Sequence, residues 1–342
     1  MKPVKTLLFT TAVAGVLASP VAAQETLTFA SWGGSYQEAQ RKAWLNHVEE
    51  ELNVEVEEET LSGLADVRVQ VRSGSVSWDI VDLGVTGCAI GARQDLLEPL
   101  DYDVIDPSGI SDLMTQDHWI GAIYYSTVIA WNTNTVDDPP ENWAEFWDTE
   151  KYPGVRSIRN RPQVQLEMAR LADGVKPENL YPLDTDAAFE KLGEIKDTVS
   201  PWWSSGAQSV QLAKDGEVDL IAAWDGRLQN AIDDGAPVDY HYNEGLLNAD
   251  CLAIPKDAPN AELAQKAIGL MVSPEYQARL TDHISYGPIN TKAFETGMIP
   301  EKRAMDINTA PQNYDKQVVI DAQWWGENGA RMRERWDSFV GR

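Results

Sequence analysis

Residues 25–36 read ETLTFASWGGSY, and this stretch decides the fold. It begins as an alternating strand, turns sharply at Trp32-Gly33-Gly34, and offers Ser35 as the cap of a following helix. Hydrophobic periodicity then predicts strand, helix, strand, helix, strand in this order: Glu25–Ser31, Tyr36–Leu52, Asn53–Glu59, Leu64–Ser73 and Asp79–Leu83. Such alternation is typical of a parallel sheet that carries helices on both faces.

A second α/β region follows without a flexible linker. Its predicted strands are Trp119–Asn132, Tyr152–Ile158, Val218–Trp224 and Cys251–Ile254. Its predicted helices are Gln163–Leu171, Asp186–Lys196, Gly206–Lys214, Ala261–Met271, Pro274–Asp282 and Tyr314–Val340, the last with Trp324, Trp325 and Trp336 as core residues. We expect two lobes that exchange strands, namely residues 24–131 plus 252–303 and residues 132–251 plus 304–342.

The first 23 residues have the pattern of a removable secretion signal. Lys2 and Lys5 precede the apolar run Leu7–Ala18, and Val21-Ala22-Ala23 supplies the small residues of a cleavage site. The cleavage site has no cysteine, so we expect no lipid anchor. No later segment approaches the ~18 apolar residues of a membrane span. The sequence therefore predicts an exported periplasmic protein that does not span the membrane.

The charge balance argues against a nucleic acid partner. With 28 basic and 54 acidic residues, the formal net charge is −26, which repels phosphate groups. The acidic residues are scattered, which favours a solvating surface over a binding patch. We expect a monomer.

Cys88 and Cys251 are the two cysteines of the chain. An even pair in an oxidising compartment predicts a disulfide, although 163 positions separate the two residues. The sequence lacks Cys-x-x-Cys motifs and clusters of histidine with cysteine, which argues against a structural zinc site.

Motifs for catalysis are also missing. There is no His-Glu-x-x-His, no Gly-x-Ser-x-Gly, no Walker loop and no Gly-x-Gly-x-x-Gly. We therefore expect a binding protein without cofactor or metal. A secreted hydrolase that uses paired carboxylates stays open as an alternative, although no particular pair stands out.

Several residues that follow predicted strands could contact a ligand, since α/β sheets bind ligands beyond the carboxyl ends of their strands. An indole attracts an ammonium group, a carboxylate can pair with it, and an arginine can hold a carboxylate through two hydrogen bonds. The tryptophans could instead belong to the core, and the charged residues could cap or pair locally. The candidates are Trp32, Tyr36, Thr86, Trp224, Asp225, Arg227 and Asp250, with Arg159 and Arg161 as a further possible anion clamp.

Five segments resemble the periplasmic spermidine/putrescine-binding protein family: SWGGSY, WDIVDLGVTG, DLIAAWDGR, NEGLLNADCLAIPKDAPN and YGPIN. The resemblance implies a class II periplasmic-binding-protein-like fold, with two α/β lobes joined by crossing strands, a ligand between them, and delivery to an inner-membrane ABC permease. It also implies ligand-binding roles for Trp32, Thr86, Trp224, Asp250 and Tyr286.

Two departures from that family bear on the ligand. Asn248 stands where the polyamine receptors have a tryptophan, and Arg159 and Arg161 stand in a region where they carry acids, with Glu167 further along. The resemblance implies a polyamine, whereas the arginines favour a shorter zwitterion such as γ-aminobutyrate. A ferric-ion receptor of the same fold is a weaker alternative, because neighbouring Tyr124 and Tyr125 would point to opposite faces of a strand.

Overall fold

The computed structural model describes residues 25–341, so the predicted secretion signal lies outside the described residues. One mixed sheet has the strand order β2-β1-β3-β8-β5-β7-β6, with β4 and β9 beside β5 and β10 beside β8. The strands are β1 Thr26–Ser31, β2 Glu55–Thr60, β3 Ile80–Gly84, β4 Thr115–Gln116, β5 Trp119–Asn132, β6 Arg156–Ser157, β7 Leu220–Trp224, β8 Val238–Ala253, β9 Gly287–Pro288 and β10 Val318–Val319.

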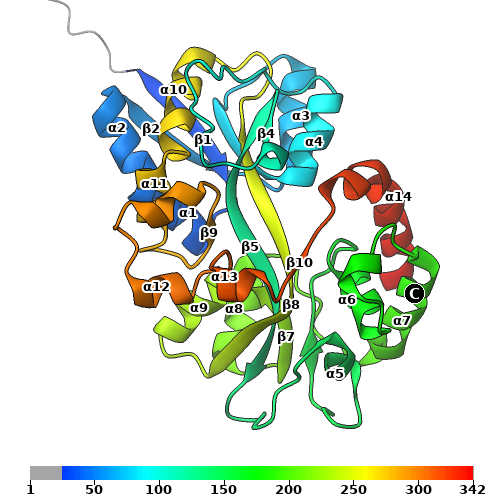
Figure 1. Ribbon diagram of the computed structural model, residues 1–342. Coiled ribbons are helices and arrows are strands. Elements are labelled where there is room, and N and C mark those ends of the chain that lie inside the picture. The colour runs from blue at the N-terminus through cyan, green and yellow to red at the C-terminus, as the bar shows by residue number, and fades with distance from the viewer. Residues whose placement is uncertain (1–24, 342) are drawn as a thin grey trace, which may run out of the picture.

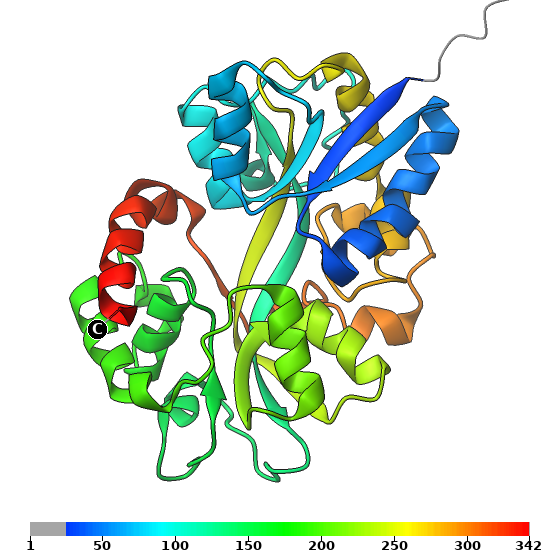
Figure 2. The ribbon, with the colours of Figure 1, turned by 180° about the vertical axis from the view of Figure 1, so that it is seen from behind.

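Helices cover both faces of the sheet (Figures 1 and 2). The α-helices are α1 Gly34–Gln40, α2 Asn46–Leu52, α3 Leu64–Ser73, α4 Val85–Arg93, α5 Trp143–Trp147, α6 Gln165–Ala172, α7 Thr185–Ile195, α8 Gly206–Asp215, α9 Asp225–Asp233, α10 Ala261–Met271, α11 Pro274–Leu280, α12 Glu301–Met305, α13 Pro311–Tyr314 and α14 Ala322–Val340. Shorter turns are the π-helix η1 Arg41–Leu45 and the 3₁₀-helices η2 Asp112–Met114, η3 Pro177–Asn179, η4 Lys196–Thr198 and η5 Thr291–Glu295.

The long antiparallel strands β5 and β8 connect two α/β lobes (Figure 1). At one end, β8 pairs with β3, which continues the parallel set β2-β1-β3 of the first lobe. At the other end, β5 pairs with β7, which carries β6 in the second lobe. This is the predicted fold class, in which crossing strands join two lobes. The predicted lobe boundaries stay a prediction.

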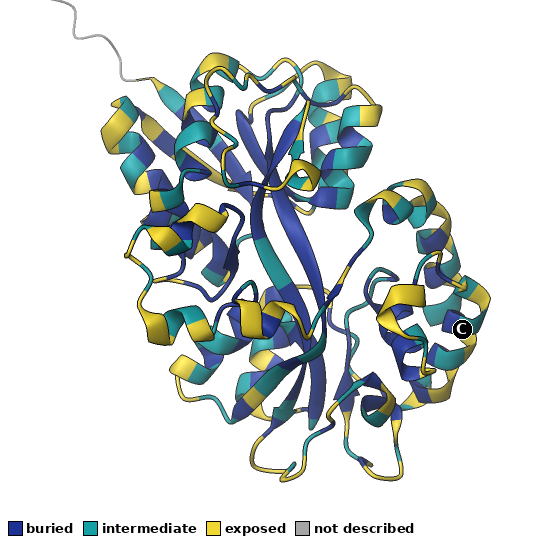
Figure 3. Cartoon of the chain, in the orientation of Figure 1, coloured by how far each residue is buried: buried dark blue, intermediate teal, exposed yellow. Residues whose placement is uncertain are grey.

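The crossing strands are largely buried, although Tyr124 and Tyr125 in the middle of β5 are only partly buried, and the helices expose their outer faces (Figure 3). Separate apolar cores fill the two lobes. Trp44, Phe29 and Ile268 are buried in the first, and Trp143, Trp325 and Trp336 in the second. Trp324, which was also predicted as a core residue, is partly buried and packs against the second of these cores.

Three predicted elements differ from the structure. The helix predicted at Tyr314–Val340 is divided into α13, β10 and α14, because β10 pairs with β8 and Asp321 caps α14 by accepting a hydrogen bond from the Trp324 amide. The strand predicted at Tyr152–Ile158 shortens to β6. The short strand predicted at Cys251–Ile254 is the end of the sixteen-residue β8. The first half of β8 is only partly buried and carries polar residues, so the sequence shows no continuous apolar run that would predict a strand there.

The Cys88–Cys251 disulfide is present and confirms that prediction. It joins α4 to β8. Both residues are fully buried, beside the junction of β3 with α4.

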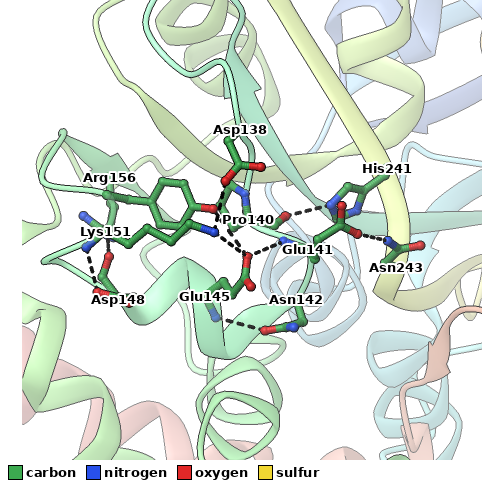
Figure 4. Close-up of polar contacts among 11 residues, drawn as sticks. Asp138, Pro140, Glu141, Asn142, Glu145, Asp148, Lys151, Arg156, His241 and Asn243 are labelled. Carbon is green, nitrogen blue, oxygen red and sulfur yellow. Dashed lines mark hydrogen bonds and ion pairs between the residues drawn. The ribbon is translucent and has the colours of Figure 1, made fainter.

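A polar network fixes the segment between β5 and β6 at the far end of the second lobe (Figure 4). His241 on β8 binds the Pro140 carbonyl at 2.8 Å, and Asn142 caps α5. Lys151 pairs with Asp138 and Glu145. Within residues 25–341, no helix is long and apolar enough to cross a membrane.

Candidate ligand-binding site

A cavity of about 700 Å³ lies where the two lobes face each other. The first lobe contributes the turn after β1, the β3–α4 junction and α3. The second contributes the β7–α9 junction, residues 159–163 and α14, while β5 and β8 form the floor. The cavity thus lies beyond the carboxyl ends of β1, β3 and β7, where α/β sheets bind ligands.

The two sides of the cavity also touch each other directly. The Gln163 amide donates to the Thr86 hydroxyl at 3.3 Å, and the Arg227 guanidinium donates to the Gly33 carbonyl at 3.3 Å. The Arg93 guanidinium on α4 donates to the Gly326 carbonyl on α14 at 2.8 Å. Because these bonds span the lobes, the arrangement is a closed one.

Aromatic rings line the inner part of the cavity. Tyr286 lies 5.3 Å from Tyr36 and 6.2 Å from Tyr125, measured between ring centroids, and Tyr125 lies 5.9 Å from Trp224. Gly226 permits this packing, because a Cβ there would stand 2.5 Å from the Tyr286 ring. The rings offer faces for an ammonium group or for methylene carbons.

The acidic end of the cavity consists of Asp250 on β8 with Asp82 on β3 behind it. The Asp82 carboxylate accepts hydrogen bonds from the Tyr36 hydroxyl and the Gln40 amide. Burial raises the pKa of Asp82 to about 7, and burial with the charge of Asp82 raises the pKa of Asp250 well above its usual range. An ammonium group placed here would relieve the repulsion between the two carboxylates.

The basic end of the cavity carries several arginines. Arg159 and Arg227 both face Trp224, with guanidinium carbons 4.7 and 5.7 Å from its ring centroid. Burial lowers the pKa of Arg159 to about 10, and Arg161 and Arg333 add repulsion. Within residues 25–341, Arg159, Arg161, Arg227 and Arg333 form no ion pair, and the buried Nε atoms of Arg159 and Arg227 lack hydrogen-bond partners.

Seven of the eight residues predicted to contact a ligand line this cavity. They are Trp32, Tyr36, Thr86, Trp224, Arg227, Asp250 and Tyr286. Arg159 and Arg161, the suggested anion clamp, line it as well, and so does Asn248. The structure shows that all of these residues line the cavity. Their role in binding stays a prediction.

Asp225 is the exception, since it does not line the cavity. It is fully buried, and it accepts hydrogen bonds from the Ser126 amide at 3.0 Å, the Asn308 amide at 2.7 Å and the Tyr242 hydroxyl at 3.2 Å. As the first residue of α9 it turns back toward the sheet, whereas Trp224 and Arg227 on either side face the cavity. These hydrogen bonds hold the start of α9 in place, so the contacts of Asp225 are structural.

Sequence reasoning missed Tyr125, Gln163, Arg68 and Arg333 as cavity residues. Tyr125 could have been found, because alternation along the predicted strand places it on one face. Arg333 could not, because nothing local in the sequence shows that α14 crosses to this wall. No group of three or more His, Cys, Asp or Glu side chains in residues 25–341 is arranged to hold a metal ion.

Comparison with known proteins agrees with this architecture. Residues 43–307 match the bacterial extracellular solute-binding protein family. The chain is 30% identical to the gamma-aminobutyric acid-binding protein of Pseudomonas aeruginosa, over 95% of this chain and 94% of that protein. It is 26% identical to the spermidine/putrescine-binding periplasmic protein of Escherichia coli K12, over 63% of this chain and 60% of that protein.

A solved structure shows the same fold. An ABC transporter substrate-binding protein from Bradyrhizobium japonicum USDA 110 superposes with a TM-score of 0.89 at 40% identity, covering 93% of this chain and 100% of that one. Such receptors are not enzymes, which argues against the alternative of a secreted hydrolase with paired carboxylates. The family match over most of the chain and the full-length similarities place this protein among the bacterial extracellular solute-binding proteins, the periplasmic receptors of ABC importers.

Proposed function

We propose that this receptor captures a small molecule that carries both an ammonium group and a carboxylate, and delivers it to its ABC permease. The observation that carries the proposal is the charge of one closed cavity, whose wall carries the carboxylate of Asp250 together with arginines that form no ion pair among the described residues.

Asp250 is the natural partner of the ammonium group. It is 7% exposed, and within the described residues its carboxylate accepts no hydrogen bond from another side chain. A buried carboxylate without a partner is costly, and an ammonium group supplies both charge and hydrogen bonds. The rings of Tyr36, Tyr125 and Tyr286 would surround the methylene carbons beside it.

Arg227 and Arg159 are the natural partners of the carboxylate. Arg227 lies in the first turn of α9, where backbone amides also favour an anion, although its own Nη2 already bonds the Gly33 carbonyl. A carboxylate bound here would contact the second lobe while the ammonium group contacts β8 and the first lobe. Contacts with both lobes favour the closed state.

The E. coli relative supports a polyamine as the alternative ligand, but the charges on the cavity wall fit a polyamine poorly. A polyamine needs an anion near each end, because an unpaired buried ammonium group is unfavourable. The cavity wall offers no second carboxylate among its described residues and presents Arg159, Arg161 and Arg333, which would repel a second ammonium group. The relative named for γ-aminobutyrate covers more of the chain and supports the zwitterionic reading.

Competition calorimetry on the full protein, after removal of co-purified ligand by unfolding and refolding, tests the proposal. We expect γ-aminobutyrate or a related amino acid to bind and putrescine to bind at least about 10-fold more weakly. Tight binding of putrescine with no measurable binding of amino acids would contradict it. Mass spectrometry of the ligand that co-purifies with the untreated protein provides an independent check.

A further inference from the structure

A second group of arginines in the cavity has no role in binding a simple zwitterion. Arg161 in the segment after β6 and Arg333 on α14 line the same wall, and Arg68 on α3 lines the wall of the other lobe. Arg159, Arg161 and Arg333 line one cavity, and Arg333 lowers the pKa of the other two through charge repulsion. We propose that Arg161 and Arg333 hold a second carboxylate, so that the ligand is an amine with two carboxylates.

The placement of Arg161 is fixed by its neighbours. Asn160 is held from two sides, since its amide donates to the Trp203 carbonyl at 2.7 Å and its Oδ1 accepts from the Trp336 indole at 2.8 Å. The Arg161 amide donates to the Arg159 carbonyl at 2.8 Å, so the chain makes a tight turn at Asn160. This held turn presents both Arg159 and Arg161 to the cavity.

The placement of Arg333 follows from the packing of α14. Trp325, Gly329 and Arg333 recur every four residues and form a stripe that faces the cavity. Trp325 is buried and donates to Glu167, and Trp336 is buried against Asn160, so the helix cannot rotate freely. The stripe brings Arg333 to the wall that Arg161 already occupies.

Charge balance favours a second acidic group. Among the charged side chains on the cavity wall, five are arginines and one, Asp250, is a carboxylate. A zwitterion adds one charge of each sign and leaves this excess unchanged. A ligand with one ammonium group and two carboxylates reduces it, and arginine matches carboxylate geometry through paired hydrogen bonds.

The inference rests on the proposed function, and a matched pair of ligands separates the two. The probes are γ-aminobutyrate and N-(2-carboxyethyl)-γ-aminobutyrate, which differ by one carboxylate-bearing arm. We expect calorimetry to show the dicarboxylate binding about 10-fold more tightly to the wild type. In the Arg161→Gln/Arg333→Gln double variant this ratio should fall to about 1. Arg331→Gln, which removes one positive charge from an exposed position on α14, should keep the wild-type ratio.

The outcomes distinguish the failures. If γ-aminobutyrate binds but the dicarboxylate gains nothing, or if the double variant keeps the gain, the second carboxylate site is wrong and the proposed function stands. If putrescine alone binds, both are wrong. If neither γ-aminobutyrate nor the dicarboxylate binds, a thermal-shift titration with malonate tests the second carboxylate site. The unfolding midpoint should rise in wild type and in Arg331→Gln but not in the double variant, and an equal response in all three would overturn the second site.

Discussion

The two ends of the cavity handle charge in opposite ways. At the acidic end, Asp82 and Asp250 are held on β3 and β8, and Asp82 is bonded by Tyr36 and Gln40. At the basic end, the arginines come from the segment after β6, from α9 and from α14, and they lack acidic partners among the described residues. One end is built into the sheet of the first lobe, and the other is assembled from helices and loops of the second.

The difference between the acidic and basic ends indicates which interactions would supply the binding energy. Both ends bury charge at a cost, since burial raises the pKa of the aspartates and lowers that of Arg159. The carboxylates are held at β3 and β8, whereas four of the five arginines on the cavity wall come from the second lobe. A ligand that carries the complementary charges offsets both costs at once, which links recognition to closure.

The largest expected effect concerns the pH dependence of stability at the acidic end. The pKa of Asp82 is raised from 3.8 to about 7, chiefly by burial, while Tyr36 and Gln40 oppose the shift. Between these values the folded protein binds more protons than the unfolded chain, so its stability falls as pH rises from about 4 to 7. One such carboxyl corresponds to a change on the order of 4 kcal/mol.

Urea unfolding of the ligand-free protein at several pH values measures this effect. Asp82→Asn should flatten the fall in stability relative to wild type, because the amide does not ionise. Some slope will remain, since Asp250 and Asp225 also have raised pKa values. An unchanged slope in Asp82→Asn would show that Asp82 does not titrate in this range.

The next effect contrasts a buried and an exposed aspartate of α9. Asp225→Ala should lower the free energy of unfolding by about 3 kcal/mol, because it removes the buried carboxylate that accepts from the Ser126 and Asn308 amides and from the Tyr242 hydroxyl, and it leaves the Ser126 amide without an acceptor. Asp233→Ala, at an exposed position of α9, should stay within about 0.5 kcal/mol. Equal losses in the two variants would contradict the structural role of Asp225.

Asp250 should behave in the opposite manner. Asp250→Asn keeps the shape but removes the charge, so we expect ligand affinity to fall at least about 10-fold, or ~1.5–3 kcal/mol, while the midpoint of ligand-free unfolding stays the same or rises because a buried charge is removed. Asp239→Asn, at the exposed end of the same strand, is the matched control. Calorimetric titration of each variant with the ligand measures the change in affinity. Wild-type affinity in Asp250→Asn would place this carboxylate outside the site.

The two ends also differ in how far the sequence predicts them. The bounds of β5 were predicted correctly, because its apolar run is continuous, and the ends of β1 and β7 placed Trp32 and Trp224 on the cavity. Asp225 was predicted beside them but does not line the cavity, since sequence does not show which way the first residue of a helix turns.

The basic end was the harder part because it depends on tertiary packing. Arg159 and Arg161 could be noticed as a local pair, but Arg333 lies 172 positions beyond Arg161 and reaches the cavity only through the course of α14. The predicted helix Tyr314–Val340 had no break, so it gave no means of placing that residue. Capping by Asp321 and the pairing of β10 with β8 set its position.

The smallest expected effect tests the geometry of the basic end rather than its charge. Arg227→Lys keeps the positive charge but loses the planar fork that can bind a carboxylate through two hydrogen bonds. We expect the affinity for γ-aminobutyrate to fall about 5- to 10-fold, or ~1 kcal/mol, while the weaker binding of putrescine stays the same. Competition of the two compounds on wild type and variant gives both values in one experiment. A parallel loss for both would mean that Arg227 acts by closing the lobes through its bond to the Gly33 carbonyl. A loss for neither would leave Arg159 as the carboxylate partner.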